Sequence, residues 1–394
     1  MKGALSGITV IDCSRVVAGP YAGMLLGDLG ANIIKVESPI KGDDGRKMTP
    51  FYGDDSCYFL LANRNKRSLT IDLKTASGKQ ILDRLLSTAD VLIENYRPQA
   101  AKQLGLSYDI LAKKFPKLIH CSITGFGATG PLSDRPAMDA MIQAFTGVMS
   151  VTGEKGRPPV RMGVALADLG AALYAAYGIL AAIQARHSSG VGQKVETSLM
   201  ESSVALAAFQ NTSFWATGEA PQRLGSAHAA MAPLQVFEVV DGYLLVMAGT
   251  QNQWKSLCKV LGLESLEKDP RFETNQARVS HRDLLHRLIG QELIKRTKKE
   301  WVDLFATEDI QFSLVNDIGE ALSEPQVLHQ EMVIERDHPV LDKMKFTGFP
   351  VKFSATPSEF RMDPPQIGQH TNEIMREAGY SEEEISDLKK NGAI

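Results

Sequence analysis

Short apolar runs that suit β-strands alternate with stretches of helical spacing along the first half of the chain. The predicted strands are residues 7–13, 31–37, 68–73, 89–95, 117–127 and 191–199. The predicted helices are residues 18–30, 77–88, 107–112, an Ala-rich segment from about residue 165, and 202–210. Strands that alternate with helices favour an α/β fold in which helices cover both faces of a parallel sheet.

The pattern changes in the second half of the chain. Residues 233–249 form two alternating runs on either side of Asp241-Gly242, which predicts a β-hairpin. From Asn252 to Phe305 the spacing is helical. We therefore expect two domains, a large one made of residues 1–223 and 318–394 and a small α+β one made of residues 224–317.

One apolar stretch, residues 163–183, is long enough to span a bilayer. It is rich in Ala and Gly, and Asp168 lies in its first turns, where a charge is costly in hydrocarbon. We expect a fully buried core helix and no membrane association. The apolar run near the N-terminus is too short for the core of a signal peptide, so the cytoplasm is the expected compartment.

Composition and charge exclude several classes of protein. The 394 residues include 43 Lys and Arg and 46 Asp and Glu, a net charge of −3, which argues against a nucleic-acid partner held by bulk charge. Hydrophobic residues make up 44% and charged residues 23%, as in soluble globular proteins. The four cysteines are isolated, without the spacing of a disulfide scaffold or a metal site, and no metal is expected.

Residues 125–130 (GFGATG) match the G-x-G-x-x-G pattern of dinucleotide-binding proteins and follow a predicted strand. Pro131 and Pro136 come soon after, so no helix N-terminus is presented to a pyrophosphate. A glycine-permitted turn is the better interpretation. The sequence also has no G-x-S-x-G and no H-E-x-x-H, which disfavours a serine hydrolase and a zinc protease.

Three charged residues suggest a binding site. Lys74 and Arg97 each come just after a predicted strand, where α/β sheets bind their ligands, and two cations there suit a nucleotide with several phosphates. A solvated surface is the alternative. Asp168 stands in an otherwise apolar helix, and a buried carboxylate must be paired, capped or functional. Its alternative is a helix N-terminal position stabilised by the dipole.

Several long segments resemble, in the same order, the family III CoA-transferases, the group that includes formyl-CoA and carnitine CoA-transferases. These segments are residues 7–46, 65–74, 89–99, 122–139, 161–183, 223–233, 240–249, 349–357 and 367–373. The resemblance covers nearly the whole chain. It implies a Rossmann-like large domain, a small domain and an interlocked homodimer in which two ring-like chains thread through each other.

The resemblance also implies the site. Asp168 matches the family's catalytic aspartate, which attacks an acyl-CoA thioester and passes through anhydride and aspartyl-CoA intermediates. Coenzyme A is placed near Val17, Ala18, Ile71, Lys74, Asn95, Tyr96, Arg97, Ala137, Met138 and Asp139. The expected donor is succinyl-CoA or acetyl-CoA, and the expected acceptor is a small carboxylic acid, above all a dicarboxylate such as oxalate, malate or glutarate. Arg161, Arg223 and His228 are candidates to meet a second carboxylate or to face solvent.

The family includes α-methylacyl-CoA racemases, which are the alternative function. They pair the aspartate with a histidine for α-proton exchange, and the matching position here is Met138, which cannot carry a proton. The formyl-CoA transferases close their site with a run of glycines. The nearest loop here, Gly225 to His228, lacks that run, so a formyl-CoA and oxalate pair is not expected. Ser38 and Gln103 stand where some relatives carry arginine.

Overall fold

The computed structural model describes residues 3–308, 310–338 and 342–394, and the chain divides into two compact units. The larger unit comprises Met1–Val148, Arg161–Glu219 and Glu331–Ile394, and the smaller unit comprises Met149–Val160 and Ala220–Gln330. The chain therefore enters the smaller unit twice, whereas the sequence analysis placed that domain at 224–317 alone. The first entry is a short segment whose sequence pattern carries no signal of the unit it packs with.

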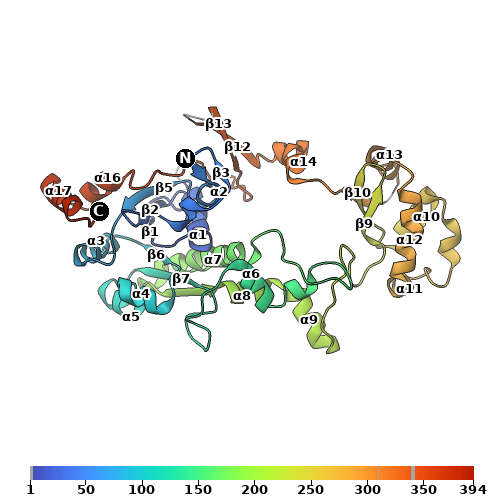
Figure 1. Ribbon diagram of the computed structural model, residues 1–394, viewed down its shortest axis with the longest axis horizontal. Helices are drawn as coiled ribbons and strands as arrows, with labels where there is room; N and C mark the ends of the chain where they lie inside the picture. The colour runs from blue at the N-terminus through green and yellow to red at the C-terminus, as the bar shows by residue number, and fades with distance from the viewer. Residues whose placement is uncertain (1–2, 309, 339–341) are drawn as a thin grey trace. The chain divides into compact units, whose positions relative to one another are not determined.

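A six-stranded parallel sheet is the centre of the larger unit (Figure 1). Its strands, in spatial order, are β5 Lys66–Thr70, β2 Asn32–Glu37, β1 Thr9–Asp12, β6 Val91–Glu94, β7 Ile119–Thr124 and β8 Lys194–Ser198. All five neighbouring pairs are parallel. The predicted α/β fold with a parallel sheet is confirmed. Five of the six strands lie within their predicted ranges, and β5 begins two residues before the predicted 68–73.

Helices cover both faces of this sheet, because successive residues of each buried strand point to opposite sides. On β6, Val91 and Ile93 face one core and Leu92 faces the other. The first core is covered by α1 Ala18–Asp28, α6 Asp139–Phe145, α7 Leu166–Ser189 and α8 Leu199–Leu206. The second core is covered by α3 Ala76–Leu86, α4 Pro98–Leu104, α5 Tyr108–Lys114, α16 Thr371–Glu377 and α17 Glu382–Lys390.

Smaller elements complete the larger unit. A single helix was predicted over residues 202–210, but the structure has two helices, α8 and α9, which meet at Ala207. The remaining elements are the 3-10 helix η1 Asp44–Lys47, the short hairpin of β3 Phe51–Tyr52 and β4 Asp55–Ser56, α2 Cys57–Leu60, α9 Ala208–Thr217, and the hairpin of β12 Val333–His338 and β13 Asp342–Thr347.

The smaller unit is built on an antiparallel sheet in the order β11-β10-β9. The hairpin predicted at Asp241-Gly242 is confirmed, and Gly242 supplies a φ of 145° at the start of β10. Helices pack on this sheet around Trp254 and Phe305. The elements are η2 Met149–Val151, β9 Leu234–Val239, β10 Gly242–Met247, α10 Gln251–Leu261, η3 Glu264–Lys268, α11 Asn275–Ser280, α12 Arg282–Leu293, α13 Lys298–Phe305, β11 Gln311–Leu314, α14 Ile318–Ser323 and α15 Pro325–His329.

The long helix α7 is buried on one face only. Ala171 and Ile179 are fully buried against the sheet, whereas Leu173 and Tyr177 on the opposite face are 57% and 71% exposed. The expectation of a fully buried helix is therefore wrong for the single chain, because the apolar residues surround the helix and the sheet covers only one side. By length and composition the helix would also suit a membrane span, although half of its most apolar stretch is buried in the protein.

Candidate active site

A cavity of about 1110 Å³ lies in the larger unit at the carboxyl ends of the central strands. Its lining includes the segments that directly follow β1 and β6, residues 15–18 and 95–97, together with Thr124 and Gly125 at the end of β7. Asp168 of α7 lines the same cavity. This is the edge at which parallel sheets place their ligands.

Most of the residues singled out from the sequence come together in this cavity. Asp168 lines it, with Val17, Ala18, Asn95, Tyr96, Arg97, Ala137, Met138 and Asp139. Ile71 and Lys74 are not among the lining residues: Ile71 is 2% exposed and packs in the same core as α3, and Lys74 is exposed beyond the edge strand β5. Contact of any of these residues with coenzyme A stays a prediction.

The glycine-rich segment 125–130 forms a turn, as expected. β7 ends at Thr124, and Gly127 and Gly130 adopt φ angles of 104° and 95°, which favour glycine. Gly125 is needed for another reason, since a Cβ there would lie 2.3 Å from the Cβ of Ala137. This close approach brings the segment that contains Ala137 against the end of β7 and so helps to form the wall of the cavity.

The loop between β1 and α1 is fixed by side chains from neighbouring strands. The side-chain amide of Asn95, just after β6, donates to the backbone O of Arg15 and accepts from its N–H, both at 2.8 Å. The Arg15 guanidinium lies 5.0 Å from the centre of the Tyr96 ring, a cation–π contact. Arg15 and Asn95 thus hold the two strand ends of the site together.

The same loop has a backbone conformation that needs support. Val16 has a φ of 66°, which is costly for a β-branched residue. Its N–H donates to Asp43 Oδ1 at 3.0 Å, and the buried Asp43 pairs with the buried Lys35 at 2.7 Å. Lys35 Nζ also donates to the backbone O of Ser14 at 3.0 Å. Buried charges of the larger unit therefore determine where the loop delivers Val17 and the start of α1.

Helix α1 points its N-terminus at this cavity. Val17 occupies the N-cap position and has no polar side chain, so it cannot satisfy the first N–H groups of the helix. Val17, Ala18 and Tyr21 all line the cavity. The unsatisfied N–H groups and the positive end of the helix dipole suit a phosphate or a developing oxyanion.

Asp168 is partly buried in the first turn of α7. Burial raises the pKa of its carboxyl to about 7, and the nearby negative charge of Asp139 also raises this pKa. A carboxylate that has lost part of its hydration is a stronger nucleophile than one in water, and a shifted pKa in a cavity is typical of a functional group. The structure thus favours a chemical role for Asp168 over dipole stabilisation of the helix alone.

Three further arginines belong to the cavity. The sequence analysis missed Arg15 and Arg135 and named Arg161 only as a candidate to meet a second carboxylate or solvent. Arg15, Arg135 and Arg161 all line it. Arg15 follows β1 directly, so the reasoning that selected Arg97 after β6 applied to it equally. Arg135 lies in a loop without a periodic pattern, and nothing in the sequence separated it from a solvated charge.

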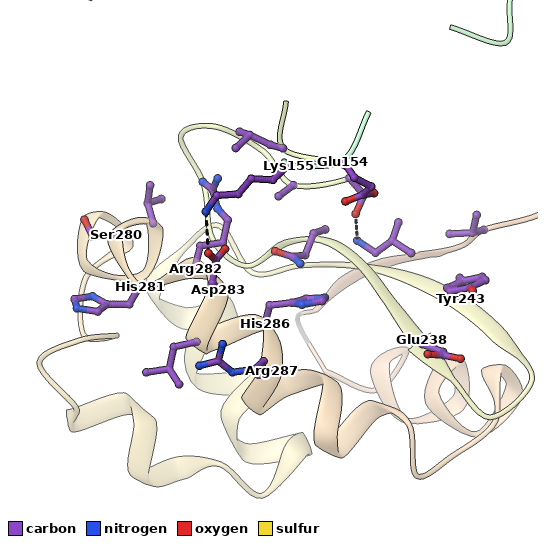
Figure 2. A pocket seen from close by; sticks show the side chains of 18 residues that line it. Glu154, Lys155, Glu238, Tyr243, Ser280, His281, Arg282, Asp283, His286 and Arg287 are labelled. Atoms are coloured by element: carbon purple, nitrogen blue, oxygen red, sulfur yellow. Dashed lines mark hydrogen bonds and ion pairs between the residues drawn. The ribbon is translucent and has the colours of Figure 1, made fainter. Parts of the chain in front are cut away.

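The smaller unit contains a separate cavity of about 970 Å³, shown in Figure 2. Two of its charged residues form an ion pair, in which Lys155 Nζ lies 2.9 Å from Asp283. Arg282 donates to the backbone O of His228 at 2.7 Å and so fixes the loop after Gly225. Arg223, a candidate above to meet a second carboxylate or to face solvent, donates to the backbone oxygens of Arg157 and Ser150 in the same unit.

Comparison with known protein sequences gives a consistent result. A sequence model of CoA-transferase family III matches residues 5–371. The human succinyl-CoA:glutarate CoA-transferase is 36% identical over 392 residues, which cover 99% of this chain and 90% of the human protein. The acetyl-CoA:oxalate CoA-transferase of Acetobacter aceti is 37% identical over 354 residues, 90% of each protein.

Solved structures show the same fold. The crystal structure of a CAIB/BAIF family protein from Brucella suis superposes with a TM-score of 0.86 at 35% sequence identity. The match covers 96% of this chain and all of that chain. The cavity described above therefore lies in a fold shared along the whole chain.

Proposed function

Because this chain belongs to family III of the CoA-transferases, we propose that it transfers coenzyme A from succinyl-CoA or acetyl-CoA to a small dicarboxylic acid. The observation that carries the proposal is the position of Asp168, a partly buried carboxylate in a cavity that also contains the N-terminus of α1 and several arginines. Relatives named for succinyl-CoA with glutarate and for acetyl-CoA with oxalate support this substrate class.

The first half of the proposed reaction transfers the acyl group away from coenzyme A. The Asp168 carboxylate attacks the thioester carbonyl of the donor, the C–S bond breaks, and a mixed anhydride and CoA thiolate form. The thiolate then attacks the aspartyl carbonyl of the anhydride. The donor acid leaves as its carboxylate, and coenzyme A remains on Asp168 as a thioester.

The second half reverses these steps with the acceptor. The acceptor carboxylate attacks the aspartyl thioester, CoA thiolate leaves, and a second anhydride forms. The thiolate attacks the acceptor acyl carbonyl, which releases the new acyl-CoA and restores the Asp168 carboxylate. A carboxylate suits this sequence, because every intermediate stays activated and no hydrolysis step is needed.

The surroundings of Asp168 supply the other requirements of this chemistry. Each attack produces a tetrahedral oxyanion, and the free N–H groups at the start of α1, next to Val17, are suitable donors. Arg15 and Arg97 line the cavity at two strand ends and suit the phosphates of coenzyme A. Arg161 also lines it and is the candidate to bind the second carboxylate of the acceptor.

The racemase alternative finds no acid–base partner at the predicted position. Met138 lines the cavity and is 66% exposed, and a thioether cannot exchange a proton. Deuterium appearing at the α-carbon of a chiral 2-methylacyl-CoA in deuterated water, without an acceptor acid, would support the racemase instead.

A mass-spectrometric exchange assay tests the proposed function. The protein is incubated with succinyl-CoA or acetyl-CoA and a panel of carboxylic acids that includes glutarate, oxalate and malate, and new acyl-CoA species are measured. We expect CoA to appear on at least one dicarboxylate and the donor acid to be released in equal amount. Monocarboxylates of the same length are the matched control. No exchange with any pair would refute the proposal.

We also propose that the protein is a homodimer. The exposed faces of α7 and α9 carry large apolar residues, among them Tyr177 at 71% and Trp215 at 77% exposure, and an exposed apolar face is typical of an interaction surface. A second copy would cover this surface without a membrane. Light scattering should give twice the 43.0 kDa chain mass, and a single-chain mass at micromolar concentration would contradict the proposal.

We keep the cytoplasm as the proposed compartment. All four cysteines lie in the part of the chain that the structure describes and are free, which suits a reducing environment.

A further inference from the structure

The start of α7 has an unusual arrangement of hydrogen bonds. The helix begins at Leu166, and its N-cap residue is Ala165, whose side chain cannot accept the N–H groups of the first turn. An acceptor comes instead from another helix: Asp139 Oδ1 receives the N–H of Ala167 at 2.8 Å. Asp139 thus makes, from α6, the bond that a capping side chain normally makes within its own helix.

The second carboxylate oxygen of Asp139 is also engaged. It accepts from Gln143 Nε2 at 2.7 Å, one turn further along α6. Gln143 is fully buried, its Oε1 accepts the N–H of Met162 at 2.9 Å, and its Nε2 lies 3.4 Å from the backbone O of Val164. The segment from Met162 to Ala167, which leads into α7, is therefore hydrogen-bonded to two side chains of α6, Asp139 and Gln143.

This arrangement lies directly before the proposed nucleophile. Asp168 follows Ala167 in the chain, so the bond that Asp139 makes determines where the first turn of α7 begins and how the Asp168 carboxylate enters the cavity. Both carboxylates line the same cavity. Asp139 is 8% exposed, and its two oxygens are used by the protein, which distinguishes it from a residue that faces a ligand.

We propose that Asp139 is a positioning residue for the CoA-transfer reaction, which caps α7 from outside and places Asp168 for attack on the thioester. This inference rests on the proposed function of Asp168. Burial of both groups also brings a second negative charge near the nucleophile, and Asp139 contributes to the raised pKa of Asp168. Asp139 therefore orients the Asp168 side chain, and its negative charge destabilises the ionised form of the Asp168 carboxyl before the reaction.

Two substitutions separate these contributions. D139N keeps an oxygen acceptor for the Ala167 N–H, removes the charge and sets an NH2 donor against Gln143 Nε2, whereas D139A removes both acceptors. With the donor and acceptor pair found for the wild type, we expect kcat of D139A to fall roughly tenfold to a hundredfold, the cost of a misplaced reacting group, while KM for the acyl-CoA stays within about twofold. D139N should recover the part of the lost kcat that depends on the bond to the Ala167 N–H.

The control is a variant that weakens α7 without touching its start. Ile179 is fully buried about three turns further along, and I179V should lower the melting temperature while leaving kcat unchanged. A D139A variant whose kcat is unchanged would overturn the proposal. So would a matching rise in KM with constant kcat, which would make Asp139 a substrate contact.

A second measurement needs no substrate, so it tests the electrostatic link between Asp139 and Asp168 even if CoA exchange is not found. The unfolding free energies of the protein with and without D168N are compared from pH 4 to pH 8, in the wild-type and D139N backgrounds. The folded pKa of Asp168 is raised, so its contribution to stability is present below its unfolded pKa and is lost as pH rises to about 7. With D139N this loss should be smaller and complete at lower pH. An identical pH dependence in both backgrounds would refute the link between the two residues.

Discussion

The Asp168→Asn variant is expected to lose CoA transfer by roughly a thousandfold or more while it still folds and binds acyl-CoA. The amide has almost the same shape as the carboxylate, but it cannot attack a thioester to form an anhydride. Because Asp168 is partly buried with a pKa raised to about 7, the neutral amide also removes a group whose charged form burial disfavours. The variant should therefore be at least as stable as the wild type at pH 8.

Three measurements check this expectation. Exchange rates give the loss of activity, calorimetric titration with acyl-CoA gives the affinity, and thermal unfolding at pH 8 gives the stability. Incubation of the wild type with donor alone should also add coenzyme A covalently to the protein, and Asp168→Asn should lack this adduct. Asp303→Asn, an exposed aspartate of α13 paired with Lys299, is the control and should behave as the wild type. Turnover within tenfold of the wild type in Asp168→Asn would exclude Asp168 as the nucleophile.

The sheet was predictable because its signal is local. Each strand of the larger unit is a short apolar run between helical segments, and burial on both faces needs only that run. The start of β5 was missed, because the predicted strand began at residue 68 and Lys66 and Arg67 before it are charged. Both side chains are buried in the strand because they form ion pairs with residues far away in sequence, Lys66 with Asp12 and Arg67 with Glu373. Such pairs leave no local pattern in the sequence.

The site was predictable to a similar degree. Asp168 was recognisable as an isolated charge in an apolar helix, and Arg97 as a cation at a strand end. The role of Asp139 in capping α7 depends on a hydrogen bond across 28 residues, for which neither spacing nor composition gives a sign. The exposed face of α7 was mispredicted, because the apolar composition of a helix does not show which neighbouring elements cover each of its faces.

A cluster of buried charges positions the backbone of the loop between β1 and α1. Lys66 Nζ donates to Asp12 Oδ2 at 2.8 Å, to the backbone O of Pro20 in the first turn of α1 at 2.7 Å, and to Asn63 Oδ1 at 3.0 Å. Asp12, in turn, accepts the backbone N–H of Ser14 at 3.0 Å. The end of β1 and the start of α1 therefore share the Lys66 ammonium group as a partner, while Lys35 binds the loop between them.

The Lys66→Met variant is expected to lose about 3–5 kcal/mol of unfolding free energy, because Asp12 is fully buried and would keep its charge without its closest partner. The pKa of Lys66 is lowered to about 8 by burial, so denaturant unfolding is measured at pH 6, where Lys66 is charged. Lys102→Met, an exposed lysine of α4, is the matched control and should change stability by less than about 0.5 kcal/mol.

A double variant tests whether the loss comes from the unpaired charge. Adding Asp12→Asn to Lys66→Met removes that charge while keeping an acceptor for the Ser14 N–H, so the double variant should be more stable than Lys66→Met alone by about 1 kcal/mol or more. Neither variant has the bond from Lys66 to the backbone O of Pro20 at the start of α1, so we expect a raised KM for acyl-CoA in both. Two results would contradict this prediction. One is an unfolding free energy of Lys66→Met within about 1 kcal/mol of the wild type. The other is a double variant whose loss equals the sum of the losses of the two single variants, since Lys66 and Asp12 would then not be coupled.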